Sequence, residues 1–167
     1  MLDHPLPPDV NDCSIPDGEI LYRRIHPTKP QLEKTSVAGE YRPASGALKD
    51  TEWPLSVDLG SLSTPQQTRD RESTPFHVAA FTAGTARSCT PACRIVRDPL
   101  PATPERPANP AHALVFGNHE NGSGALAKSQ FKHIARTARI VLLNENAPLV
   151  VREEQSPGGQ SSDAAGH

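Results

Sequence analysis

Residues 76–117 decide the fold of this chain, and they read FHVAAFTAGTARSCTPACRIVRDPLPATPERPANPAHALVFG. They hold its densest apolar runs, and burial of apolar surface is the main favourable term in folding. Three short strands are predicted within them, at Phe76–Phe81, Cys93–Arg97 and His112–Phe116. The links are too short for helical crossovers, so we expect these strands to fold on one another in antiparallel fashion. Ala83–Ser88 is small enough to form one or two helical turns.

A proline-rich bridge separates the last two of these strands. It spans residues 99–110 and contains prolines at 99, 101, 104, 107 and 110. Proline has no backbone donor, so it is excluded from the central strands of a sheet. The bridge is therefore predicted to be a surface connection.

Two further strands are predicted on the N-terminal side. Glu19–Ile25 (EILYRRI) carries apolar and charged residues on both faces. Leu55–Leu59 (LSVDL) alternates cleanly, with its apolar residues inward and Ser56 and Asp58 outward. Between them, residues 28–43 are polar and show no period, which favours a long loop.

Two helices follow from capping signals and periodicity. Thr64, Pro65 and Gln67 form a capping box with proline at the first helical position, which predicts a short helix that ends before Pro75. The longest helix is predicted at Gly124–Arg139, with Ser123 or Asn121 as its cap. Its apolar stripe consists of Ala127, Phe131, Ile134 or Ala135, and Ala138. Ile140–Leu143 is predicted to be either a last strand or an extension of this helix.

Length and composition favour one small α+β domain. The chain has 167 residues, of which only 35% are hydrophobic and 18 are proline, so part of it is predicted to lie outside the packed core. We expect a flexible leader at residues 1–17, a single domain at 18–143 and a disordered tail at 144–167. The domain is predicted to hold a mostly antiparallel sheet of four or five strands, with one main C-terminal helix packed on one face.

Net charge and the number of cysteines limit the kinds of partner and compartment that we expect. The net charge is −2, so no general field attracts nucleic acid or an anionic membrane, and no apolar run is long enough to span a bilayer. Four basic residues line one face of the last helix without interleaved aromatics, a pattern that favours a solvated helix face over a nucleic-acid partner: Lys128, Lys132, Arg136 and Arg139. The N-terminus has no secretory signal pattern, and three cysteines, an odd number, favour a reducing cytoplasm.

One group of polar residues is a candidate site for a phosphate-bearing or nucleotide ligand. Guanidinium groups beside an imidazole suit a phosphate or a carboxylate, and hydroxyls and acids nearby would complete such a site. The candidate residues are Arg24, His26, Arg42, Ser45, Asp50 and His77. Ser56 could add a hydroxyl, and Asp58 could orient a histidine. Alternatively, Arg23 and Arg24 straddle a strand and simply pair with surface acids.

A second, weaker candidate is a zinc site built from Cys89, Cys93 and His112. The cysteine spacing is not a usual zinc-finger spacing, so two ordinary thiols are the alternative. No cofactor is otherwise expected. A G-x-S-x-G elbow and both glycine-rich phosphate loops are absent from the sequence.

Several pieces of the chain, in this order, resemble a group of short bacterial proteins of uncharacterised activity. The pieces are LYRRIHP (21–27), RPASGALKD (42–50), LSVDL (55–59), AAFTAGTAR (79–87), RDPLP (97–101) and PAHALVFG (110–117). The group has an aromatic residue where this chain has Leu48. The resemblance implies a bacterial, cytoplasmic, single-domain protein and supplies no catalytic residue. An LYR strand followed by a serine-bearing strand is also similar to ADP-ribosyltransferase-type toxins, but no catalytic glutamate is placed.

The sequence is compatible with three functions. The first is a non-enzymatic regulatory or interaction module whose partner is another protein, since the chain is short, proline-rich and without a recognised catalytic motif. The second is a small enzyme or binding domain for a phosphate-bearing or nucleotide ligand. The third is a zinc-stabilised binding module.

Overall fold

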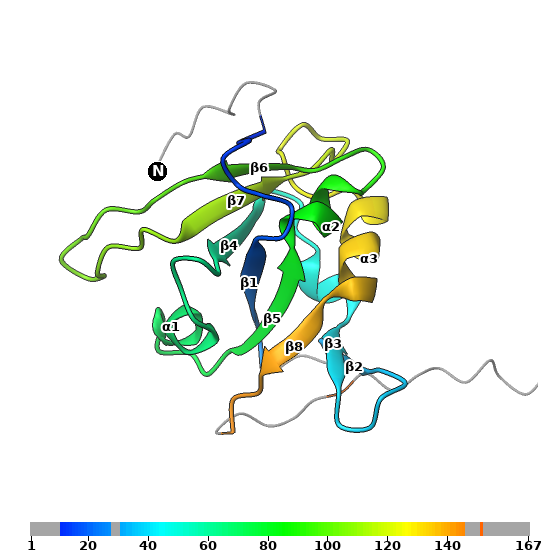
Figure 1. Cartoon of the computed structure of the whole chain (residues 1–167), viewed down its shortest axis with the longest axis horizontal. Coiled ribbons are helices and arrows are strands. Elements are labelled where there is room, and N and C mark those ends of the chain that lie inside the picture. The colour runs from blue at the N-terminus through cyan, green and yellow to red at the C-terminus, as the bar shows by residue number, and fades with distance from the viewer. Residues whose placement is uncertain (1–10, 28–30, 146–150, 152–167) are drawn as a thin grey trace, which may run out of the picture.

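A six-stranded antiparallel sheet forms the centre of the molecule in the computed structural model (Figure 1), which describes residues 11–27, 31–145 and 151. Its strands are β1 (Ile20–Ile25), β4 (Leu55–Leu59), β5 (His77–Thr82), β6 (Arg94–Arg97), β7 (His112–Phe116) and β8 (Arg139–Leu142). The predicted α+β class with a mostly antiparallel sheet is confirmed, although the sheet has six strands rather than four or five.

The order of the strands corrects one prediction. They lie in the order β6-β7-β4-β1-β5-β8. The two strands that flank the proline bridge, β6 and β7, do pair with each other. However, β5 lies beyond β4 and β1, so the three strands of residues 76–117 are not a contiguous trio. Alternation along a strand indicates which face is buried, and it carries no information on which strand lies alongside.

The segment predicted as a long loop at residues 28–43 instead contains a hairpin. β2 (Leu32–Lys34) pairs antiparallel with β3 (Tyr41–Pro43) to make a separate two-stranded sheet. The turn between them is closed by the Thr35 amide, which donates to the Glu40 carbonyl at 3.1 Å. Gly39 has a φ of +78°, a conformation that glycine adopts without the steric cost that other residues meet. A short 3₁₀ turn, η1 (Ser45–Leu48), follows.

The helices are short. α1 (Pro65–Asp70) has the predicted capping box: the Gln67 amide donates to Thr64 Oγ1, and the Thr64 amide donates to Gln67 Oε1. α2 (Ala83–Arg87) follows β5 directly. α3 (Lys128–Thr137) begins four residues later than predicted.

The late start of α3 has a side-chain cause. Gln130 Oε1 accepts from the amides of Ala127 and Asn118, and residues 125–127 stay outside the helix. The carbonyls of Gly124 and Ala125 accept instead from the amides of Gly117 and His119, just after β7. After α3, residues 139–142 form the strand β8, which settles the predicted alternative between strand and helix.

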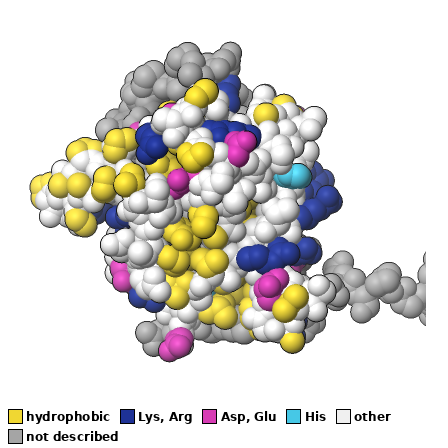
Figure 2. Space-filling model, in the orientation of Figure 1, with side chains coloured by type: hydrophobic (Ala, Val, Ile, Leu, Met, Phe, Trp, Pro, Cys, Tyr) yellow, Lys and Arg dark blue, Asp and Glu magenta, His cyan; other side chains and the backbone are white. Residues whose placement is uncertain are grey.

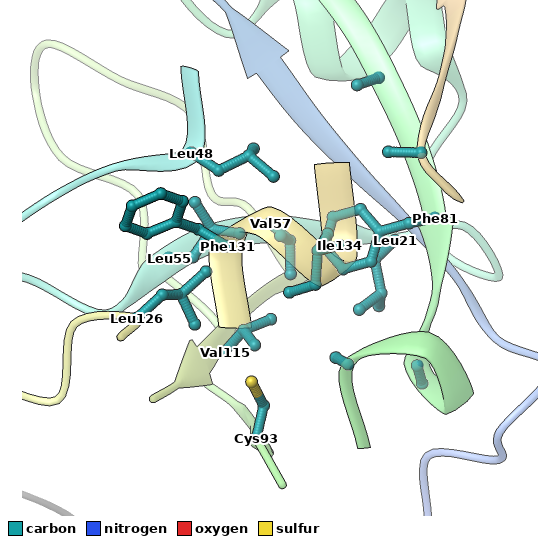
Figure 3. Packing of buried hydrophobic residues seen from close by; sticks show 14 of the residues in the cluster. Leu21, Leu48, Leu55, Val57, Phe81, Cys93, Val115, Leu126, Phe131 and Ile134 are labelled. Atoms are coloured by element: carbon teal, nitrogen blue, oxygen red, sulfur yellow. The ribbon is translucent and has the colours of Figure 1, made fainter. Parts of the chain in front are cut away.

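The core lies between the sheet and α3. Phe131 and Ile134 of α3 belong to one buried cluster with Leu55, Val57 and Val115 of the sheet (Figure 3). Along β4, Leu55, Val57 and Leu59 are buried, as predicted from the alternation. The residues between them face the other side of the sheet, where the candidate site lies.

Residues 11–17 are packed against the domain. Ile15 is 1% exposed and belongs to the core, and the Asp12 amide donates to the Ile95 carbonyl of the edge strand β6 at 2.9 Å. Arg87 adds hydrogen bonds to Asn11 and to the Asp12 carbonyl. The packed structure therefore begins several residues before Gly18, where the sequence placed its start.

At the other end, the Asn144 amide donates to His77 Nδ1. The rest of the predicted leader and tail, residues 1–10, 146–150 and 152–167, lies outside the described residues. Within the described part of the chain, no helix is both long enough and apolar enough to cross a membrane.

Candidate functional site

A cavity of about 450 Å³ lies on the face of the sheet that α3 leaves uncovered. In Figure 1, α1 and the β6–β7 connection (residues 98–111) lie on the side of β4 and β1 away from α3. The connection projects as an arm on which hydrophobic side chains gather (Figure 2). The cavity is lined by Tyr22, Arg24, Ser56, Val57, Asp58, Thr68, Arg71, Glu72, Leu100, Pro101, Thr103, Arg106, Pro107, Asn109 and His112.

Ser56, His112 and Asp98 are connected to one another, and Ser56 and His112 line the wall of this cavity. Ser56 Oγ lies 2.5 Å from His112 Nε2. On the other side of the ring, His112 Nδ1 lies 2.8 Å from the Asp98 carbonyl oxygen and 3.1 Å from Asp98 Oδ2. Because Nδ1 faces two acceptors, it carries the ring proton, and Nε2 is left to accept from the Ser56 hydroxyl. The serine is therefore hydrogen-bonded to a basic nitrogen whose ring is held in place.

Strand register brings Ser56 and His112 together. β4 and β7 are antiparallel, with Ser56 opposite Leu114 and Asp58 opposite His112. Ser56 and His112 are thus diagonal neighbours on one face of the pair, within reach of each other's side chains. The Asp98 amide donates to the His112 carbonyl at 3.0 Å, which fixes the first residue of the connection beside the ring.

Asp58 anchors both walls of the cavity to β4. This buried carboxylate accepts from Thr68 Oγ1 at 2.8 Å, Arg71 Nε at 2.7 Å and Asn109 Nδ2 at 2.9 Å. Burial opposes its charge, but the three donors together outweigh burial, so the pKa of Asp58 is lowered from its ordinary value. Asp58 therefore stays ionised and ties the α1 region and the β6–β7 connection to the sheet.

The Arg23 side chain bonds to the backbone of β4 at Ser56. Its Nη1 donates to the Ser56 carbonyl at 3.0 Å, beyond the point where the pairing of β1 with β4 ends at Tyr22 and Asp58. Burial, and then the charge of Arg24, lower the pKa of Arg23 to about 10, so the group remains charged at neutral pH. The guanidinium thus stabilises the strand where backbone pairing stops.

Three charged side chains from different elements meet at the cavity. Glu72 Oε1 lies 3.4 Å from Arg24 Nη2 and 3.8 Å from Arg106 Nη1. Arg24 comes from β1, Glu72 follows α1, and Arg106 belongs to the β6–β7 connection. The Arg24 guanidinium also lies over the Phe76 ring, 5.3 Å from its centroid.

The six candidate ligand residues do not share one cavity. Arg24 lines the cavity described above, whereas Arg42 and Ser45 line another of about 180 Å³ beside α3. The hydroxyl that lies next to His112 is that of Ser56, which was predicted from the sequence only as an additional hydroxyl donor.

The remaining three candidates have other surroundings. His26 follows β1, with its ring edge-on to Phe76. Asp50 accepts from the amides of Glu52 and Trp53 and so caps a turn. His77 is buried, and desolvation lowers its pKa.

The zinc alternative finds no support within the described residues, which contain no group of three or more His, Cys, Asp or Glu side chains arranged to hold a metal ion. Cys89 and Cys93 are both buried in the core. A hydrogen bond between them lowers the pKa of Cys89 and raises that of Cys93. His112, the proposed third ligand, bonds instead to Ser56 and Asp98.

No family model, no curated protein and no solved structure matches this chain. The chemistry of the site is therefore inferred from the positions and environments of its own residues.

Proposed function

We propose that the protein is a small enzyme that hydrolyses acyl esters, or closely related acyl compounds, with Ser56 as the nucleophile. The observation that carries this proposal lies at the wall of the cavity: Ser56 is hydrogen-bonded to His112, and the His112 Nδ1 faces both the carbonyl oxygen and the carboxylate of Asp98. The proposal develops the expectation of a small enzyme or binding domain. The expectation of an interaction module stays a prediction.

His112 performs the proton transfers. Its Nε2 takes the proton of the Ser56 hydroxyl as Oγ attacks the acyl carbon, and it then gives that proton to the departing alkoxide. A water molecule, deprotonated by the same nitrogen, attacks the acyl-serine, and the acid leaves as the Ser56 hydroxyl is restored. Asp98 accepts from Nδ1 throughout, which holds the ring and stabilises the imidazolium.

The cavity suits a small substrate. Its volume of about 450 Å³ falls in the range of about 300–1,000 Å³ that is typical of small-molecule sites. Leu100, Pro101 and Pro107 supply apolar wall, while Ser56 and His112 supply polar groups at one place. An apolar enclosure with a few convergent polar groups is the usual form of such a site.

Labelling with a fluorophosphonate, which reacts with activated serines, tests the proposal. We expect the full chain to be labelled at Ser56, as mapped by mass spectrometry, and to hydrolyse short-chain p-nitrophenyl esters. Ser56→Ala should lose both properties, and His112→Asn should reduce hydrolysis by about 10³-fold or more, because the base is removed.

The matched control is Ser45→Ala, which removes a serine hydroxyl outside this cavity and should leave both readouts unchanged. Thermal unfolding of each variant establishes that it is folded. Labelling spread equally over several serines, or ester hydrolysis that survives Ser56→Ala, would overturn the proposal.

A further inference from the structure

The three-charge cluster Arg24–Glu72–Arg106 carries an inference about the substrate. A carboxylate oxygen of the chain itself stands between two guanidinium groups at the cavity. Guanidinium groups bind carboxylate and phosphate best in short, bidentate contacts. The two contacts of Glu72, at 3.4 and 3.8 Å, are longer than the roughly 2.7–2.9 Å of a charge-assisted hydrogen bond.

The three arginines of the cavity differ in how closely they approach their carboxylate partners. Arg71 Nε donates to the buried Asp58 at 2.7 Å, so its guanidinium is already held by a close carboxylate in the cavity wall. Arg106 is 69% exposed, and its pair with Glu72 is of the exposed, water-screened kind that contributes little to stability. The Arg24–Glu72 pair is more enclosed, with side chains 25% and 33% exposed. An incoming anion therefore replaces Glu72 when it makes shorter contacts to both arginines than Glu72 does.

Arg24 lines the same cavity as the reacting serine and lies on the same face of the sheet. Tyr22 of β1 pairs with Asp58 of β4, and both Arg24 and Ser56 lie two residues further toward the same end of the strand pair. A period of two places all four side chains on the same face. Phe76 lies beneath the guanidinium and limits its freedom.

We infer that the substrate is an acyl compound with an anionic end, a carboxylate or a phosphate, that Arg24 and Arg106 bind in place of Glu72. This inference rests on the proposed function, because the acyl carbon is the group attacked by Ser56. Glu72 then acts as a competitor for the anion and favours substrates whose anionic end fits both arginines.

Three p-nitrophenyl esters with acyl chains of equal length test the inference. One chain ends in a carboxylate, one in a phosphate monoester and one in a neutral methyl ester. For the wild-type protein we expect kcat/KM to be about tenfold or more higher for at least one anionic ester than for the neutral one, since hydrogen bonds to charged groups are strong. The two anionic esters distinguish the carboxylate from the phosphate.

Two variants give opposite shifts. In Arg24→Gln combined with Arg106→Gln, the ratio of kcat/KM for anionic over neutral ester should fall to about one, because the charges that distinguish the esters are gone. In Glu72→Gln the same ratio should rise, which loss of a merely structural contact would not produce. Arg69→Gln, on α1 but outside the cavity, is the control and should keep the wild-type ratio.

Failure of the inference is distinguishable from failure of the proposed function. Hydrolysis through Ser56 with no preference for either anionic ester would overturn the inference alone. If Ser56 proves unreactive, thermal unfolding with glutarate or inorganic phosphate decides: stabilisation that the double arginine variant loses supports the anion site, and no stabilisation overturns it.

Discussion

At the scale of single residues, Asp58 is the group on which the cavity walls depend. It is buried, yet it is held by Thr68, Arg71 and Asn109 from two separate segments. A buried charge is tolerated when its hydrogen-bonding capacity is filled in this way. Removing the charge leaves Arg71 without its counterion in a partly buried position.

Asp58→Asn should lower the free energy of unfolding near neutral pH by about 2 kcal/mol, the value of one strong hydrogen bond to a charged group. The pKa of Asp58 is below 3.8 in the folded state, while an unfolded carboxyl keeps that ordinary value. The unfolded state therefore takes up the proton first on acidification. The stability that wild type gains from Asp58 is complete above about pH 5 and is lost as the pH falls through 3.8 and below.

Urea unfolding of wild type and Asp58→Asn from about pH 7 down to about pH 3 measures this difference. Asp70→Asn is the control, because Asp70 is exposed and pairs with Arg69 at the surface. A difference between wild type and Asp58→Asn that stayed constant over the whole range would contradict the assigned pKa direction.

At the scale of elements, Gly117 allows residues 124–126 to cross the end of β7. A Cβ built on Gly117 would lie 2.5 Å from Leu126 Cα, 2.5 Å from Gln130 Oε1 and 2.7 Å from the Ala125 carbonyl oxygen. Two of these neighbours are backbone atoms, which cannot move aside as a flexible side chain can. The close approach in turn places Leu126 in the core and α3 across the sheet.

Gly117→Ala should therefore destabilise the protein by about 2–3 kcal/mol, as overpacking of a closely packed site does. Urea unfolding monitored by circular dichroism gives the value. Gly46→Ala serves as the control, since a Cβ there meets nothing within 4 Å. Equal stability of the two variants would mean that the crossing relaxes freely and does not position α3.

At the scale of the whole molecule, the sheet order determines which strands are best protected. β1 and β4 lie in the middle and are paired on both sides, whereas β2 and β3 form a separate hairpin. Strands that are paired on both sides open only when the whole sheet opens. The reacting serine thus stands on one of the two innermost strands.

Amide hydrogen exchange should reproduce this order. Paired amides of β1 and β4 should exchange at the rate set by global unfolding, and those of the β2–β3 hairpin should exchange faster through local opening. Exchange followed residue by residue by NMR, with and without a low concentration of urea, separates the two classes. Slow exchange of β2 together with fast exchange of β4 would contradict the sheet order.

The local features of the fold were within reach of the sequence. The capping box at Thr64, the alternation of LSVDL and the apolar stripe through Phe131 and Ile134 depend only on neighbours within one or two turns. The hairpin at residues 31–43 was missed because its strands are only three residues long and carry no hydrophobic period.

The site was decided by the tertiary structure. Ser56 and His112 are separated by 56 residues, and only the pairing of β4 with β7 makes them diagonal neighbours. The sequence identified Arg24 but grouped it with Arg42, Ser45 and His77, which the fold places elsewhere. The amino-acid order alone determined which side chains alternate to one face and where the capped helix α1 starts, because these are short-range properties of the chain. Strand order and register join distant segments, and they depend on the packing of the complete core.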